Sequence, residues 1–331
     1  MGRERAQEDL HDLSWLDPRR AASIEAARRP PGSSRPGRLV RLLESERLLA
    51  PILLAPAVIL LGAFVAYPFA SGIRLSLSNT TVGDPGHFVG LVNFVKAWQD
   101  SIFRTAFANT LFYTFWATLF KLGLGMWLAI LLNRRFRGNR LVRAAMLLPF
   151  IVPTVLSTFA WRWMFDPTFS VLNWLLYHLD VIETPLPFLS NGTWAMWCAI
   201  VVNTWRGMPF FAITLLAGLQ TINPDLHEAA SLDGANGWQR FRHVIWPLLR
   251  PVTVVVVVFS VIQTFSDFQL VYVLTGGGPA NSTQLLATYA YEVGVATGLL
   301  GQGAAISLFM LPVLFIVVWL QLRYLHRLEA A

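Results

Sequence analysis

Six long apolar windows constrain the fold of this chain more than any other feature of its sequence. A hydrocarbon core about 30 Å thick requires roughly 20 mainly apolar residues per helix, and a helix satisfies its own backbone hydrogen bonds there. A composition of 55% hydrophobic and 14% charged residues is also unlike that of soluble domains. The sequence therefore predicts an all-α membrane protein with six spans, approximately at 48–70, 105–132, 141–165, 194–220, 249–274 and 303–325.

The distribution of positive charge predicts the orientation of these spans. Most of the 26 Lys and Arg residues precede the first window, follow the last, or lie in the turns after the second and fourth windows. The opposite loops hold only Arg74, Lys96 and Arg104. By the positive-inside rule both termini are expected in the cytoplasm. The net charge of +7 is thus explained by membrane topology, and no nucleic-acid partner is expected.

The chain is expected to divide into a tail and one membrane domain. Residues 1–47 form a basic cytoplasmic tail, and residues 48–327 form the six-span domain. The segment 39–49 has amphipathic spacing, which fits either an interfacial helix or a simple extension of the first span.

The cytoplasmic loop 223–247 carries clear local signals for two short helices. Asn223 and Pro224 are typical of a cap and first residue, and Gly234 can end the helix in the left-handed conformation, which predicts a helix over 224–233. Asn236 and Gln239 have the spacing of a capping box for a second helix, which Pro247 is expected to stop or kink.

This elbow combines small and acidic side chains in its first helix. Small residues allow the close approach of a partner, and carboxylates offer charge to its Arg or Lys. The sequence therefore predicts a docking surface that includes Glu228, Ala229, Ala230 and Asp233.

The loop resembles the signature of permease subunits of binding-protein-dependent ABC importers. That signature is Glu-Ala-Ala, three residues, Gly, nine residues, Ile, one residue and Leu-Pro. Glu228, Gly234 and Pro247 stand at this spacing, whereas Val244 and Trp246 replace the Ile and Leu. Flanking segments at 205–210, 217–220 and 274–279 look like the carbohydrate-uptake branch, typified by permeases for maltose, trehalose and glycerol-phosphate.

The resemblance implies a six-helix permease bundle in the bacterial inner membrane with a cytoplasmic coupling helix. It also implies a second permease subunit in a heterodimer, two ATP-binding subunits and an extracytoplasmic sugar-binding protein. The chain has no Gly-rich phosphate loop, so ATP and Mg are expected in the partner ATPase, and no catalytic, cofactor or metal residue is expected here. The residues implied in coupling are Glu228, Ala229, Ala230, Asp233, Gly234, Ala235 and Pro247.

Polar residues within the fourth and fifth windows mark a candidate substrate pathway. Ionisable side chains are unfavourable in the bilayer unless they pair or face water. Hydroxyl-binding groups beside an aromatic side chain suit a sugar, and the candidates are Asn203, Trp205, Arg206, Gln263 and Asp267, the last two one helical turn apart.

Purely structural roles for the same residues are the alternative to substrate contact. Arg206 can form an ion pair with Asp267 or with a partner subunit, and Asn203 and Gln263 can make interhelical hydrogen bonds. Lys121 and Arg162 receive no function. At the level of the whole chain, the alternatives are an ion-coupled secondary transporter and a non-transporting membrane scaffold.

Overall fold

The computed structural model describes residues 17, 46–134 and 136–329. Apart from Asp17, Glu46 and Arg47, the predicted tail therefore lies outside the described residues, as does most of the segment 39–49. The chain divides at Pro68 into two compact units, which are considered separately. The described residues are mainly helical, with two isolated bridges, Ser78 with Phe88 and Thr81 with Asp84, as the only β pairing recorded among them.

A long apolar helix follows the tail. It consists of α4 (Glu46–Leu61), the π-helical turn η1 (Gly62–Ala66) and α5 (Tyr67–Ser76). The π turn ends two residues before Pro68, whose missing N–H interrupts the α-helical ladder at this place. The stretch Leu53–Ser76 is long and apolar enough to cross a membrane, and the described side chains of the helix are mostly exposed.

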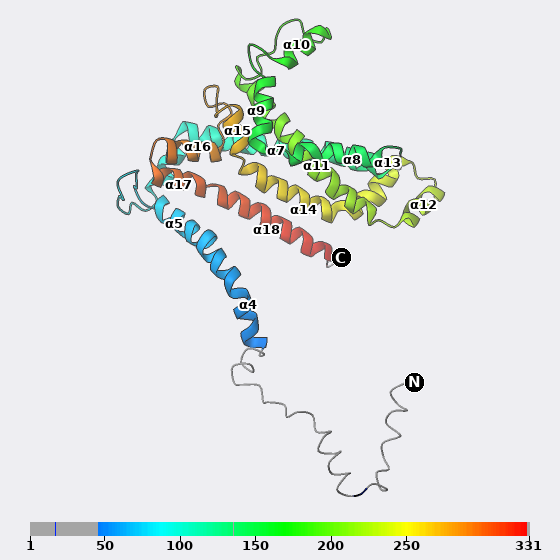
Figure 1. Ribbon diagram of the computed structural model, residues 1–331, viewed down its shortest axis with the longest axis horizontal. Coiled ribbons are helices and arrows are strands. Elements are labelled where there is room, and N and C mark those ends of the chain that lie inside the picture. The colour runs from blue at the N-terminus through cyan, green and yellow to red at the C-terminus, as the bar shows by residue number, and fades with distance from the viewer. Residues whose placement is uncertain (1–16, 18–45, 135, 330–331) are drawn as a thin grey trace. The chain divides into compact units, whose positions relative to one another are not determined.

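Two long parallel helices form the centre of the second unit (Figure 1). They are α7 (Ser101–Asn133) and α11 (Gly192–Gln220), and α14 (Trp246–Phe265) packs against both. Glycines allow the close approach of α7 and α11, because a Cβ at Gly125 would collide with Phe211 and a Cβ at Gly207 would collide with Lys121. Two apolar clusters pack the helices together. One, in the first half of the pair, includes Tyr113 and Ile200, and the other, in the second half, includes Leu132 and Leu215.

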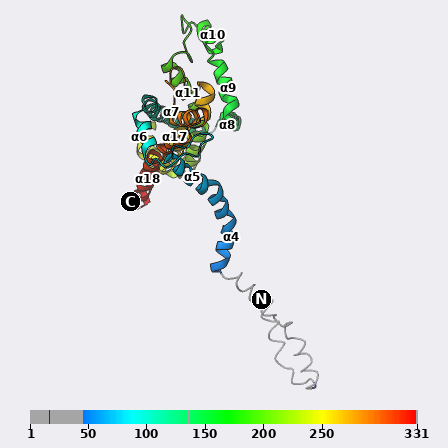
Figure 2. The ribbon, with the colours of Figure 1, turned by 90° about the vertical axis from the view of Figure 1, so that its left-hand side faces the viewer.

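The third apolar window is not one straight span. It forms α8 (Asn139–Ile151) and α9 (Thr154–Met164), which bend by 93° at the break between them. Pro153 explains the break, because it lacks an N–H and disfavours the helical conformation at Val152, which has a ψ of 131°. The next helix, α10 (Val171–His178), lies beyond the far end of α9 in both views (Figures 1 and 2).

The fifth window also differs from its predicted limits. One helical run begins at Gly237 as α13 (Gly237–Arg240), continues through the π turn η2 (Phe241–Ile245) and ends with α14 at Phe265. Residues 266–268 then break the helix before α15 (Gln269–Leu274). The predicted end of this span at 274 was wrong, because the helix ends nine residues earlier.

The remaining helices complete the unit. They are α6 (Val92–Gln99), α12 (Pro224–Leu232), α16 (Leu286–Tyr291), η3 (Glu292–Ala296), α17 (Leu300–Leu308) and α18 (Met310–Glu329). Among the described residues, five helices are long and apolar enough to span a membrane, or six if the bent pair α8–α9 counts as one span. The all-α, six-window prediction is therefore confirmed, with the third window bent and the fifth ending early.

Candidate functional site

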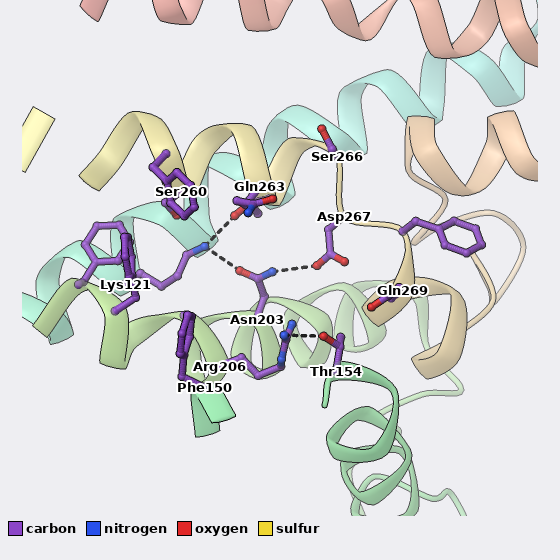
Figure 3. Close-up of a pocket in the computed structure, with 16 residues that line it drawn as sticks. Lys121, Phe150, Thr154, Asn203, Arg206, Ser260, Gln263, Ser266, Asp267 and Gln269 are labelled. Atoms are coloured by element: carbon purple, nitrogen blue, oxygen red, sulfur yellow. Dashed lines mark hydrogen bonds between the residues drawn. The ribbon is translucent and has the colours of Figure 1, made fainter. Parts of the chain in front are cut away.

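A cavity of about 600 Å³ lies where α7, α11 and α14 meet the break at 266–268 (Figure 3). The ends of α8 and α9 close one side of it through Phe150 and Thr154. Four of the five predicted pathway residues line this cavity, namely Asn203, Arg206, Gln263 and Asp267. The structure thus brings together side chains that lie up to 64 residues apart in the sequence.

Lys121 is the residue that the sequence interpretation left without a role. Its side chain is 4% exposed, and its Nζ donates hydrogen bonds to Oδ1 of Asn203 at 2.9 Å and to Oγ1 of Thr264 at 2.7 Å. These contacts join α7, α11 and α14 at one point. A lysine in the middle of an apolar window was the signal that could have identified it.

Asp267 is held by three donors from different parts of the unit. The Asn203 amide donates to its Oδ2 at 2.9 Å, the Tyr113 hydroxyl donates to the same oxygen at 2.8 Å, and the Leu270 N–H donates to Oδ1 at 3.3 Å. Asp267 lies in the break after Phe265, so it does not share a helical face with Gln263 as predicted. Both residues reach the cavity because the chain turns between them.

The ion pair between Arg206 and Asp267, one of the structural alternatives for Arg206, is not formed within the described part of the chain. The guanidinium of Arg206 donates a 2.6 Å hydrogen bond to Oγ1 of Thr154, which links α11 to α9 (Figure 3). Its Nε is buried and has no hydrogen-bond partner among the described residues. The Oγ of Ser260, which also lines the cavity, is likewise buried without a partner. Both residues thus border the cavity with side chains that are not fully hydrogen-bonded among the described residues.

Trp205 is the predicted pathway residue that the structure places elsewhere. It is absent from the cavity lining, and its ring packs edge-on against Trp161 on α9 at 5.5 Å between centroids. Adjacent residues on an α-helix point about 100° apart, so Trp205 and Arg206 face different neighbours. The aromatic surfaces of the cavity come instead from Phe150, Phe210, Phe211, Phe259 and Phe268.

The cavity has the chemistry to bind a hydroxylated ligand. Guanidinium, amide and hydroxyl groups supply donors and acceptors at its wall, while the phenylalanine rings supply apolar surface. No metal-binding group of three or more His, Cys, Asp or Glu side chains occurs within the described part of the chain.

The predicted elbow forms at one end of the unit (Figure 1). Asn223 caps α12 by accepting a 3.0 Å hydrogen bond from the Asp225 N–H, and Gly234 has a φ of +79°. Asn236 and Gln239 form a reciprocal capping box with bonds of 2.8 and 2.9 Å. The local predictions for both helix starts are confirmed.

Pro247 does not stop the helix, which continues through it. The Trp246 N–H bonds to the carbonyl of Phe241, five residues earlier, so the chain enters α14 through a π turn. Pro247 then occupies the first turn of α14, where its missing N–H has little effect on the α-helical ladder.

The elbow presents a free surface that combines acidic, small and apolar side chains. Glu228, Ala229, Asp233 and Gly234 are exposed, and Ala230, Ala235 and Pro247 are half-buried. Leu232 is 89% exposed, a feature that the sequence interpretation did not single out. A 2.8 Å hydrogen bond from Arg240 to Oγ of Ser231 connects the two helices. An exposed leucine on a braced elbow is typical of a docking surface.

Comparison with known proteins agrees with this arrangement. Residues 121–329 match the family model described as "Binding-protein-dependent transport system inner membrane component". The chain belongs to this family. The permease is 32% identical over 290 residues to the trehalose/maltose transport system permease protein MalF of Thermococcus litoralis, covering 87% of this chain and 97% of that protein.

Other relatives and a solved structure extend the comparison. The permease is 32% identical to the trehalose transport system permease protein SugA of Mycobacterium tuberculosis, covering 83% of this chain and 88% of that one. Its fold matches a chain of a bacterial ABC transporter involved in the import of the acidic polysaccharide alginate, with a TM-score of 0.75, 24% identity and coverage of 88% and 99%. The permease is thus a multi-pass inner-membrane transport protein and has a known importer fold.

Proposed function

We propose that the permease imports a sugar by alternating access and that a separate ATPase drives it through the elbow around Glu228. The observation that carries this proposal is the elbow itself, a capped and braced pair of short helices with an exposed leucine. Relatives named for trehalose, maltose and sulfoquinovosyl glycerol transport support a sugar as the substrate class.

The elbow is suited to transmit movement into the membrane bundle. The helical run from Gly237 continues without a flexible linker to Phe265, and its residues Ser260, Gln263 and Thr264 line the central cavity. A displacement of the elbow therefore moves the wall of the cavity as well. The proposed coupling surface comprises Glu228, Ala229, Ala230, Asp233, Gly234, Ala235 and Pro247.

The central cavity is the proposed place where the substrate crosses the chain. Arg206, Ser260 and Gln263 are the proposed contacts, because the first two carry buried atoms without partners and the third lines the same wall. Asn203 and Asp267 are hydrogen-bonded to each other, and Asp267 also accepts a hydrogen bond from Tyr113 on α7. Their proposed role is therefore to shape the cavity.

The proposed assembly needs partners for the remaining functions. A second, different permease subunit completes the pathway, two ATP-binding subunits hold ATP and Mg, and an extracytoplasmic protein delivers the sugar. Both termini and the elbow face the cytoplasm in this arrangement, as the charge distribution indicates.

The test is transport by the complete complex in proteoliposomes with the Gly234→Asp variant. Aspartate is disfavoured at a φ of +79° and adds a bulky charge to the docking surface, so uptake and sugar-stimulated ATP hydrolysis should be lost while the chain stays inserted.

Gly138→Asp provides a matched control for this test. Gly138 has a φ of +88° and open space around it, and it lies between α7 and α8 on the predicted cytoplasmic side. It should retain uptake, because it lies outside the elbow. Normal uptake by Gly234→Asp would contradict the coupling role.

A further inference from the structure

A second cavity lies beside the start of the fifth span, apart from the central one. Its volume is about 720 Å³, and its wall combines three basic side chains with aromatic ones. The lining residues are Trp238, Phe241, Arg242, His243, Trp246, Pro247 and Arg250. Neither the coupling surface nor the substrate pathway accounts for this combination of arginines and tryptophans.

The length of the helix places this cavity at the membrane surface. The run Gly237–Phe265 has 29 residues and is therefore about 44 Å long at 1.5 Å per residue, which exceeds a hydrocarbon core of about 30 Å. The apolar part ends at Phe265, so roughly the first nine residues extend into the headgroup layer. Trp238 lies in this region and Trp246 directly after it, at the level where tryptophan is enriched in membrane proteins.

Two arginines at this depth are available to bind an anion. Arg240 donates to Ser231, and His243 contacts the Gln239 carbonyl, so both are engaged within the elbow. Arg242 and Arg250 are exposed, and neither has a side-chain hydrogen bond or ion pair to the part of the chain that the structure describes. A planar guanidinium binds phosphate oxygens in a bidentate manner, which makes phosphate the matching ligand chemistry.

We propose that this cavity binds the headgroup of an anionic phospholipid. Arg242 and Arg250 bind the phosphate, while Trp238, which is 66% exposed, and Trp246 pack against the glycerol and upper acyl region. The lipid then fixes the start of the fifth span at the membrane surface, directly beside the elbow.

The alternative occupant of this surface is an acidic face of the ATPase. The position of Arg250 favours the lipid, because it lies 15 residues and hence about 23 Å before Phe265, within the roughly 30 Å of hydrocarbon that ends at that residue. Arg250 is therefore near the hydrocarbon boundary, where a soluble subunit docked on α12 does not reach. A long side chain at that depth extends toward the headgroups.

The test is a lipid titration of the purified complete complex in neutral detergent, followed by native mass spectrometry. The probes are phosphatidylglycerol, phosphatidylcholine and inorganic phosphate. We expect phosphatidylglycerol to bind the Arg242→Gln/Arg250→Gln variant about 30-fold more weakly than the wild type, from roughly fivefold per arginine. Phosphatidylcholine should bind both proteins equally weakly.

The variant Arg137→Gln/Arg140→Gln is the matched control. It removes the same charge from exposed positions on the same predicted side of the membrane but outside this cavity, and it should bind phosphatidylglycerol as the wild type does. An equal loss in both variants would overturn the proposal in favour of unspecific attraction. Equally tight binding of inorganic phosphate would overturn the lipid as the ligand.

A further outcome distinguishes the ATPase from the lipid. If Arg242→Gln/Arg250→Gln keeps its phosphatidylglycerol but loses the copurified ATP-binding subunits, this surface serves the ATPase and the lipid proposal fails. Because lipid binding is measured without transport, its result does not depend on whether the permease carries a sugar.

Discussion

The Nζ of Lys121 on α7 donates a 2.9 Å hydrogen bond to Oδ1 of Asn203 on α11. The amide of the same asparagine donates to Asp267, so Asn203 lies between the buried lysine and the carboxylate at the break of the fifth span. A buried charge in a membrane helix persists only when polar partners offset its loss of hydration. This chain of contacts therefore fixes the break relative to the two central helices.

Lys121→Met should destabilise the permease while leaving its exposed surface unchanged, because the side chain is buried. The change leaves Asn203 Oδ1 and Thr264 Oγ1 without their donor, and each unsatisfied buried group costs about 1–3 kcal/mol. The thermal unfolding midpoint of the purified chain should fall accordingly. Thr118→Val is the control, because its buried hydroxyl lies on the same helix and has no partner in the described part of the chain. An unchanged midpoint in Lys121→Met would refute the role of this network.

Gly207→Ala should disturb the same network from the opposite helix. A Cβ at this position collides with the side chain of Lys121, so α7 and α11 have to separate or the lysine has to leave its partners. Overpacking of this kind typically costs 1–3 kcal/mol. Gly123→Ala on α7 meets no neighbour and should be neutral or stabilising, by up to about 1 kcal/mol. Similar unfolding midpoints for both variants would contradict the close packing.

Arg206→Gln and Ser260→Ala should alter substrate affinity rather than assembly. Both residues line the cavity and carry a buried polar atom without a partner, and the one side-chain hydrogen bond recorded for Arg206 is that to Thr154. The substitutions should therefore take away contacts to the substrate at little cost to the bundle. We expect the KM for uptake to rise about fivefold or more, with a normal yield of the complete complex. Loss of the assembled complex in Arg206→Gln would instead favour the ion pair with a partner subunit.

Tyr289→Phe should destabilise the junction of α7 and α16. The Tyr289 hydroxyl donates to Asp100, whose carboxylate also caps α7 by accepting from the Ile102 N–H at 2.9 Å. Loss of a hydrogen bond to a charged group costs about 1.5–3 kcal/mol, which the unfolding midpoint measures. Tyr177→Phe, on the exposed helix α10, should leave the midpoint unchanged.

The same tyrosine predicts a pH dependence. Burial, and next the carboxylate of Asp100, raise the pKa of Tyr289 above its usual value near 10. Because the folded chain holds the proton more tightly than the unfolded chain, this contribution is complete below about pH 10 and declines as the pH rises further. The difference in midpoint between wild type and Tyr289→Phe should therefore shrink above pH 10. A constant difference would contradict the assignment.

The sequence alone determined the features that depend on neighbouring residues and on the solvent. The caps at Asn223 and Asn236 and the left-handed Gly234 were predictable because each is a contact or backbone preference within a few residues. The apolar windows were predictable because bilayer thickness fixes the length of a span. Polar residues in such windows are unfavourable unless they pair or face water, so the sequence also identified four candidates for the cavity, namely Asn203, Arg206, Gln263 and Asp267.

Only the tertiary structure decided which of these polar groups meet. Lys121 acquires its role from partners on two other helices, Trp205 is turned toward Trp161, and Asp267 reaches the cavity from a break rather than from a helical face. Local sequence signals Pro153 as a break, but the 93° bend depends on what α8 and α9 pack against. Such contacts join residues far apart in the chain, so their geometry is set by packing in three dimensions and not by spacing in the sequence.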